Sequence, residues 1–171
     1  MRGLLTTETD PLKNSTSLVH DALGRPKGKT DRNGALITYA YTLTGEISTI
    51  GYPDGSAVSR SYDALGRLAG MSDSLGVSTY AYDGAGRITA FTDANGFSLT
   101  FAYDAAGNLT GMTYPDGSAA AYAYDAANRL LSVTNALGEE ATYTYDLAGR
   151  LASLRTSTGR RPATAMTAQA G

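Results

Sequence analysis

The sequence predicts an all-β protein, a repetitive antiparallel β-hairpin meander that forms a curved or spiralling open sheet. Three observations predict this fold class. A short signature, Tyr-Asp-x-x-Gly-Arg-Leu, returns along the chain about every 21 residues. Two turn signals divide each period into segments of strand length. The composition favours strands and turns, with 20 Gly and 12 Tyr in 171 residues and no Cys or Trp.

Copies of the signature begin at positions 20, 41, 62, 82, 103, 124 and 145, and the last five match it best. The residues that define the repeat are Tyr41, Tyr62, Asp63, Gly66, Arg67, Tyr82, Asp83, Gly86, Arg87, Tyr103, Asp104, Gly107, Tyr124, Asp125, Arg129, Tyr145, Asp146, Gly149 and Arg150. A fixed period of this length marks a repeat array. We therefore predict about seven units over residues 1–159, of which the first and last match the signature poorly. Residues 160–171 are predicted to be an irregular Pro/Ala/Thr tail outside the array. The chain begins part-way through a unit, so we expect a fragment of a larger polypeptide.

A second turn signal lies about ten residues from the Asp-x-x-Gly of each signature. It occurs at residues 31–34, 52–55, 73–76, 93–96, 114–117, 135–138 and, in its most worn form, 156–159. Asp or Asn at the first position can accept hydrogen bonds from the backbone of the turn, and Gly at the fourth tolerates a left-handed conformation. Both turn series therefore predict chain reversals that join short strands.

The strand before each signature alternates, with Leu99, Phe101 and Tyr103 on one face. The strand after each signature does not alternate. Its apolar residues are three apart, as in the pair Leu68 and Met71, which would place them on opposite faces of a regular strand. We therefore expect this strand to be bulged or partly covered on both sides.

Charge and apolar content exclude several classes of partner. The net charge is −2 and both signs are interspersed, so no basic face indicates nucleic-acid binding. No run approaches about 18 apolar residues, and we see neither a membrane span nor a signal peptide. The absence of Cys excludes disulfides and thiolate metal sites.

The repeated Tyr and Asp residues allow two interpretations. Rows of Tyr could stack on sugar rings while Asp binds their hydroxyls, or Tyr could fill a sheet face while Asp caps a turn. The structural interpretation is favoured because Asp lies where turn chemistry alone would place it. The Arg four residues after each Asp could pair with that Asp or lie over a neighbouring Tyr ring.

No pattern in the sequence indicates catalysis, a metal or a cofactor. The single His, His20, takes a Tyr position, so no His-dependent triad can be assembled. The Gly-rich nonapeptide that builds calcium ladders is missing. Aspartates repeated in equivalent positions indicate a common structural duty. We therefore predict no catalytic, metal-ligating or cofactor-binding residues.

The signature, its period and the intervening Tyr-Pro-Asp-Gly turns resemble the YD repeat, or RHS repeat, of Rhs polymorphic toxins, insecticidal toxin complex shell proteins and teneurins. The resemblance runs from about Leu5 to Gly159. It implies a β-hairpin strip that spirals into a hollow shell, which encloses a toxic domain in bacterial members and belongs to an adhesion receptor in teneurins. It also implies a secreted or cell-surface location and a link with carbohydrate binding. The Asp-Pro-rich segment where family members cleave themselves has no counterpart here.

Three hypotheses about function follow. The first is a non-catalytic wall segment of such a shell, whose partners are neighbouring repeats, a second copy bound through edge strands, or an enclosed toxin domain. The second is a glycan- or cell-surface-binding module, which needs an exposed stripe formed by Tyr39, Tyr80, Tyr122 and Tyr143. The third is an enzyme, a glycosidase or a self-processing protease, which needs two carboxylates converging in a pocket.

Overall fold

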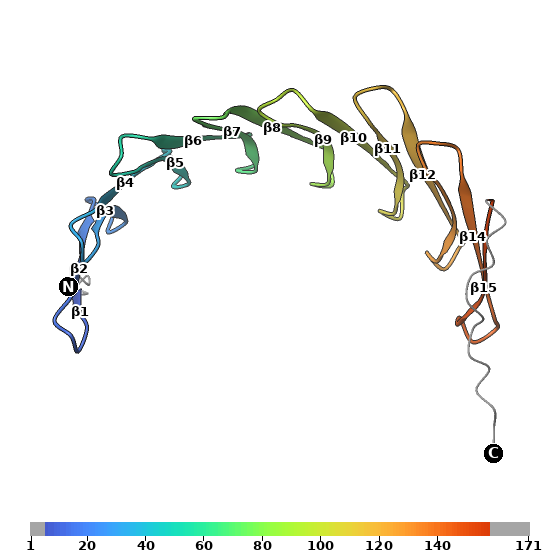
Figure 1. The fold of residues 1–171 in the computed structure, drawn as a ribbon, viewed down its shortest axis with the longest axis horizontal. Helices are drawn as coiled ribbons and strands as arrows, with labels where there is room; N and C mark the ends of the chain where they lie inside the picture. Colours follow the sequence, from blue (N-terminus) through green and yellow to red (C-terminus); the bar gives the residue numbers. More distant parts are fainter. Residues whose placement is uncertain (1–5, 158–171) are drawn as a thin grey trace, which may run out of the picture. The chain divides into compact units, whose positions relative to one another are not determined.

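The structure is a computed structural model that describes residues 6–157. Over this range the chain forms short strands joined by turns (Figure 1). The strands are β1 (Thr7–Thr9), β2 (Ser15–His20), β3 (Pro26–Thr30), β4 (Leu36–Tyr41), β5 (Ile47–Gly51), β6 (Ala57–Tyr62), β7 (Leu68–Asp73), β8 (Gly76–Tyr82), β9 (Ile88–Thr92), β10 (Ser98–Tyr103), β11 (Leu109–Thr113), β12 (Ala119–Tyr124), β13 (Leu130–Thr134), β14 (Glu140–Tyr145) and β15 (Leu151–Thr156).

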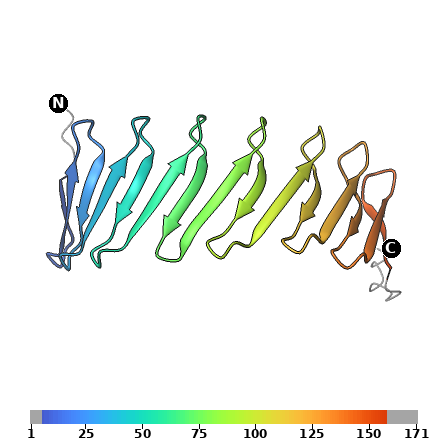
Figure 2. The ribbon, with the colours of Figure 1, turned by 90° about the horizontal axis from the view of Figure 1, so that it is seen from above.

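The strands follow sequence order in an open sheet from β1 to β15, and consecutive strands run antiparallel (Figure 2). This arrangement confirms the predicted all-β hairpin meander. Residues 6–157 contain no helix that is long and apolar enough to cross a membrane.

The chain divides into two compact units, which are described separately. The first unit comprises the residues up to Ala81 together with Thr92–Gly96, and its sheet runs from β1 into β8. The second unit comprises Tyr82–Phe91 together with the residues from Phe97 on, and it holds β10 to β15 and most of β9. Each unit has the same hairpin construction.

Most of the described turns are closed by two backbone hydrogen bonds. In the turn at residues 63–66, Gly66 N donates to Asp63 O over 3.0 Å and Asp63 N donates to Arg67 O over 2.9 Å. Gly66 has a φ of +76°, in the left-handed region that side chains disfavour. Where Gly is replaced, Lys13 and Asn128 adopt φ values of 66° and 59°. The predicted turn chemistry is confirmed in these turns, whereas residues 73–76 form a tighter connection in which Asp73 pairs directly with Gly76. The turn predicted at residues 156–159 extends beyond the described residues, and the tail predicted at residues 160–171 lies outside them.

A β-bulge explains the apolar residues that are three apart. Tyr62 lies opposite Leu68 and Ser61 lies opposite Gly70, so Ala69 between them has no partner. The extra residue restores the phase of the strand, because Met71 lies opposite Arg60, two residues from Tyr62. Leu68 and Met71 therefore share one face, as the bulged interpretation predicted. The same register shift follows the signature in the pairs β2–β3, β4–β5, β10–β11, β12–β13 and β14–β15.

Single-layered construction leaves little interior. Within residues 6–157, Ala120 is the only buried hydrophobic residue, with 6 % of its surface exposed. Tyr39, Tyr80, Tyr122 and Tyr143 are half-buried. Because these side chains are covered only by neighbours on their own face, stability depends on contacts between adjacent hairpins.

Candidate functional site

The candidate site is a repeated contact between one signature turn and the tyrosine of the next repeat. In the turn, Asp63 Oδ1 accepts hydrogen bonds from Leu65 N over 2.9 Å and from Arg67 N over 3.0 Å. Asp63 Oδ2 accepts from Arg67 Nε over 2.7 Å. The same ion pair joins Asp21 to Arg25, Asp83 to Arg87, Asp125 to Arg129 and Asp146 to Arg150. One carboxylate therefore caps the turn and holds the arginine.

These hydrogen bonds stabilise the charged form of the carboxylates. The backbone N–H of Arg67 lowers the pKa of Asp63, and the Arg67 side chain lowers it further. The pKa values of Asp21, Asp83, Asp125 and Asp146 are lowered in the same way, first by the backbone N–H of the arginine four residues later. The pKa of Asp104 is lowered first by the side chain of Asn108. The charged carboxylates of these aspartates are therefore favoured at neutral pH, and a charged carboxylate accepts the hydrogen bonds that cap the turn.

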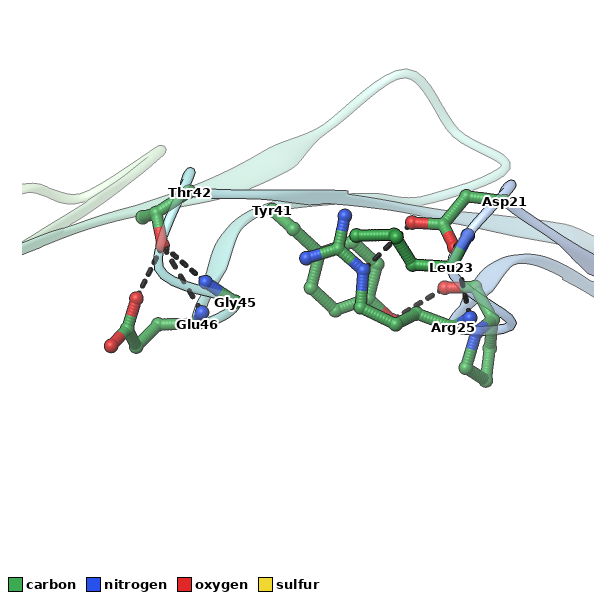
Figure 3. A network of polar contacts seen from close by, with 8 residues as sticks. Asp21, Leu23, Arg25, Tyr41, Thr42, Gly45 and Glu46 are labelled. Carbon is green, nitrogen blue, oxygen red and sulfur yellow. Dashed lines mark hydrogen bonds and ion pairs between the residues drawn. The ribbon is translucent and has the colours of Figure 1, made fainter.

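The arginine also reaches the next repeat. The Arg25 guanidinium carbon lies 4.2 Å from the centre of the Tyr41 ring (Figure 3). The same contact joins Arg87 to Tyr103 and Arg129 to Tyr145, each at 4.6 Å. Both roles proposed for the arginine from the sequence therefore occur together: it pairs with its own aspartate and covers the following tyrosine.

The tyrosine hydroxyl returns a hydrogen bond to the earlier repeat. Tyr62 Oη donates to Ile47 O over 2.8 Å, and Tyr145 Oη donates to Leu130 O over 2.9 Å. Tyr41 and Tyr103 donate in the same way to Pro26 O and Ile88 O. The acceptor is always the residue after the arginine position, 15 residues back. The sequence analysis missed this bond, although a constant offset under a fixed period could have suggested it.

Two copies replace the arginine and keep the turn. Thr42 Oγ1 accepts from Gly45 N and Glu46 N over 3.1 Å and donates to the Glu46 carboxylate (Figure 3). Asn108 Nδ2 donates to Asp104 Oδ2 and also to Asn128 Oδ1 in the following turn. Both substitutions show that the turn cap does not require the arginine, and in the Glu46 copy the next tyrosine still donates to Ile47 O.

The next repeat is what covers the arginine. The Arg25, Arg67, Arg87 and Arg129 side chains are 26–37 % exposed, but that of Arg150, in the last described copy, is 81 % exposed. The arrangement therefore joins neighbouring repeats.

The structure bears on the other sequence hypotheses. His20 ends β2 opposite Pro26, where later copies have Tyr opposite an apolar residue. Tyr39, Tyr80, Tyr122 and Tyr143, which the glycan-binding hypothesis requires as an exposed stripe, are each half-buried, neither fully open nor packed inside. Residues 6–157 bring together no group of three or more His, Cys, Asp or Glu side chains that could hold a metal ion.

Tyr145→Phe tests the contact between repeats. Removing the hydroxyl leaves Leu130 O without its 2.9 Å donor, so we expect a loss of about 0.5–1.5 kcal/mol in the free energy of unfolding. Urea titration followed by circular dichroism measures this change. Tyr143→Phe is the matched control, because the Tyr143 hydroxyl donates no hydrogen bond within residues 6–157. Equal losses in both variants would contradict a specific role for the bond.

Comparison with known proteins gives consistent results. The family model of the RHS repeat matches residues 20–57, 62–97, 82–119 and 124–161. Among curated proteins, double-stranded DNA deaminase toxin A of Burkholderia cenocepacia (strain H111) is 39 % identical over 66 residues, which cover 39 % of this chain and 5 % of the toxin.

Solved structures share the fold. A Photorhabdus luminescens Tc holotoxin pore matches 84 % of this chain and 9 % of its own with a TM-score of 0.63 and 19 % identity. The crystal structure of TcdB2-TccC3 matches 84 % of this chain and 9 % of its own with a TM-score of 0.62 and 20 % identity. The chain thus spans less than a tenth of these relatives.

Proposed function

This chain belongs to the RHS repeat family, and from that premise we propose that it is a non-catalytic wall segment of a toxin-enclosing shell. Its role is steric containment, and its array of about seven repeats over residues 1–159 is one part of a larger polypeptide. These similarities support the proposal, since the matched proteins are a toxin and Tc toxin assemblies many times longer than the chain.

The observation that carries the proposal is the way in which each repeat covers the one before it. A ring from the next repeat lies over Arg25, Arg87 and Arg129, and the tyrosine hydroxyl bonds the earlier backbone. A site of this kind gains stability with every added unit and needs no enclosed core. A strip in which every repeat makes the same contacts suits a structural wall. An active site needs side chains with different roles, which identical repeats do not provide.

The partners and location follow from this role. We propose that further repeats pair with the outer strands β1 and β15, that an enclosed toxin domain is the cargo, and that the parent protein is secreted. The Arg150 side chain is held by Asp146 at 2.8 Å and is 81 % exposed, and the sequence has Met166 at the position that corresponds to the covering tyrosine of the other copies.

We expect the isolated chain to associate through its outer strands, because within residues 6–157 β1 and β15 each pair with a single neighbouring strand. Light scattering over a concentration series should show oligomers. Ala152→Lys, on β15, should reduce this association, since a charge on an edge strand opposes pairing. Leu131→Lys is the matched control, because Leu131 holds the equivalent bulge position in β13, which lies between β12 and β14. A stable monomer at every concentration would count against the proposal.

A further inference from the structure

One cavity of the second unit combines aromatic side chains with a carboxylate. It has a volume of about 370 Å³, within the range of small-ligand pockets of about 300–1,000 Å³. The residues that line it are Phe97, Tyr114, Pro115, Asp116, Ser118 and Ala136. This cavity, the β11–β12 pocket, lies at the turn that joins β11 to β12, at the margin of the unit opposite its signature turns (Figure 2). It is therefore separate from the contact that joins one repeat to the next.

Asp116 gives the pocket a negative charge that the described chain does not neutralise. Asp116 Oδ1 accepts hydrogen bonds from Ser118 N over 2.9 Å and from Ser118 Oγ over 2.6 Å. The Ser118 hydroxyl lowers the pKa of Asp116 below its ordinary value, so the carboxylate is charged at neutral pH. No arginine or lysine within residues 6–157 pairs with Asp116. Both bonds from Ser118 end on Oδ1, which leaves Oδ2 for a ligand.

Aromatic rings beside this carboxylate select the kind of cation. Phe97 is 46 % exposed, and Tyr114 is half-buried. The face of an aromatic ring attracts an organic cation. A hard metal ion such as Ca²⁺ instead needs about six to eight oxygen ligands, which one aspartate and one serine do not supply. The pocket therefore suits an organic cation with a flat or apolar body.

The chain itself shows a cation held by the same kinds of group. In the signature turn, Arg25 Nε lies 2.7 Å from Asp21 Oδ2, and the Arg25 guanidinium carbon lies 4.2 Å from the centre of the Tyr41 ring (Figure 3). Arg129 is held in the same way in the second unit, at 2.7 Å from its aspartate and 4.6 Å from the ring of the next tyrosine. The β11–β12 pocket presents a carboxylate and rings, but no arginine lines it among the described residues.

An identical turn in the first unit separates turn chemistry from the pocket. Residues 52–56 and 114–118 both read Tyr-Pro-Asp-Gly-Ser. Asp54 Oδ1 accepts from Ser56 N over 2.9 Å and from Ser56 Oγ over 2.6 Å, as Asp116 does from Ser118. The residue that corresponds to Phe97 in this earlier copy is Ala35, as the equal registers of β4–β5 and β10–β11 show. The turn therefore forms without an aromatic residue at this position, and Phe97 is a feature of the pocket.

We propose that the β11–β12 pocket binds an arginine side chain of a partner polypeptide. The guanidinium donates to Asp116 Oδ2 and lies against the Tyr114 ring, while the methylene groups of the side chain lie on Phe97. The planar guanidinium suits both contacts better than the ammonium of lysine, because it stacks on a ring and donates in a fixed fork. This site does not depend on the proposed wall role.

Titration of the full chain with N-acetyl-arginine amide tests the site, followed by two-dimensional ¹H–¹⁵N NMR spectra. We expect the amide signals of Gly117 and Ser118 to shift with a millimolar dissociation constant, as suits contact by one side chain. The signals of Gly55 and Ser56, in the identical turn, should move much less. N-acetyl-citrulline amide, which has a similar shape without the charge, should cause little shift. Equal shifts at the two turns, or equal binding of the citrulline compound, would overturn the proposal.

Substitutions in the pocket have matched controls in the first unit. Asp116→Asn should weaken binding by about fivefold or more, because it removes the charge that pairs with the guanidinium. Asp54→Asn should leave binding unchanged. Asn occurs at the same position of two other turns, as Asn33 and Asn95, so both variants should fold, as circular dichroism would check. Phe97→Ala introduces the residue type of the earlier copy and should also weaken binding. Binding that survives Asp116→Asn and Phe97→Ala would overturn the proposal.

Two results would assign the pocket to a different source of arginine. The chain itself has Arg160 and Arg161 beyond the described residues. Tighter binding of the arginine compound after Arg160→Gln and Arg161→Gln would show that the chain's own arginines compete for the pocket. Light scattering that shows oligomers dissolving as the arginine compound is added, in natural chain but not in the Asp116→Asn variant, would assign the pocket to a second copy. Either result would overturn the proposal of a separate partner.

Discussion

Gly66→Val is expected to lower the free energy of unfolding by about 2 kcal/mol or more, because it forces a β-branched residue into the left-handed region. Gly66 has a φ of +76°, and a Cβ there would lie 3.2 Å from Glu46 Oε1. The Glu46 carboxylate is the end of a flexible side chain and can move, so most of the cost is backbone strain. Urea unfolding followed by circular dichroism measures the loss.

A graded series makes this prediction specific. Gly66→Ala should cost about 1–2 kcal/mol, whereas Gly66→Asn should cost less, because Asn128 already adopts a φ of 59° at the same position of another turn. Gly84→Ala is the control, since a Cβ at Gly84 would meet nothing within 4 Å and its φ is not positive. We expect Gly84→Ala to be neutral or to stabilise by up to about 1 kcal/mol. Similar losses at both glycines would contradict a conformational cause.

Acid is expected to destabilise the protein, because the folded chain holds the pKa values of ten carboxylates below their ordinary values. Folding lowers the pKa below the ordinary value of 3.8 at Asp10, Asp21, Asp54, Asp63, Asp83, Asp104, Asp116, Asp125 and Asp146, and below 4.5 at Glu46. The unfolded chain therefore binds more protons in acid than the folded chain. The stabilisation is complete above the unfolded values and is lost as the pH falls through the folded ones.

The measurement is the urea midpoint as a function of pH. We expect the midpoint to be level from about pH 5.5 to 7 and to fall progressively below about pH 5. A variant with Asn at positions 21, 63, 83, 125 and 146 should have a lower midpoint at pH 7 and a flatter fall in acid. Asn keeps the backbone cap, as Asn135 Oδ1 shows by accepting from Leu137 N and Glu139 N. An equally steep fall in this variant would assign the acid sensitivity to other groups.

Local chemistry explains why so much of the fold could be predicted from the sequence. Each turn is specified by residues within it, as Asp63 and Gly66 show, and a period of about 21 residues repeats the same hairpin. The bulge could be predicted for the same reason, because residues three apart, such as Leu68 and Met71, have to share a face if both are to pack. Patterns of this kind need no knowledge of distant residues.

The sequence predicted the contacts that each arginine could make, but not that the contacts occur together or that the tyrosine hydroxyl joins them. The sequence offered two partners for each arginine, an aspartate within its turn or a neighbouring ring, and Arg25 contacts both Asp21 and Tyr41. It gave no sign that the Tyr145 hydroxyl reaches Leu130 O. It also did not show which leucines remain exposed in turns, as Leu43 and Leu147 do, because exposure is not a property of a residue type.

The sequence alone determined the antiparallel hairpin strip, the two turn series, the bulged strand and membership of a repeat family, because these depend on contacts between residues close in the chain. The tertiary structure decided how one repeat holds the next and which rings are half-buried. These features depend on how neighbouring strands are aligned, because the residues in contact are 15 or more positions apart in the chain. That register is fixed only when the strands have paired and each bulge has set the direction of the side chains that follow.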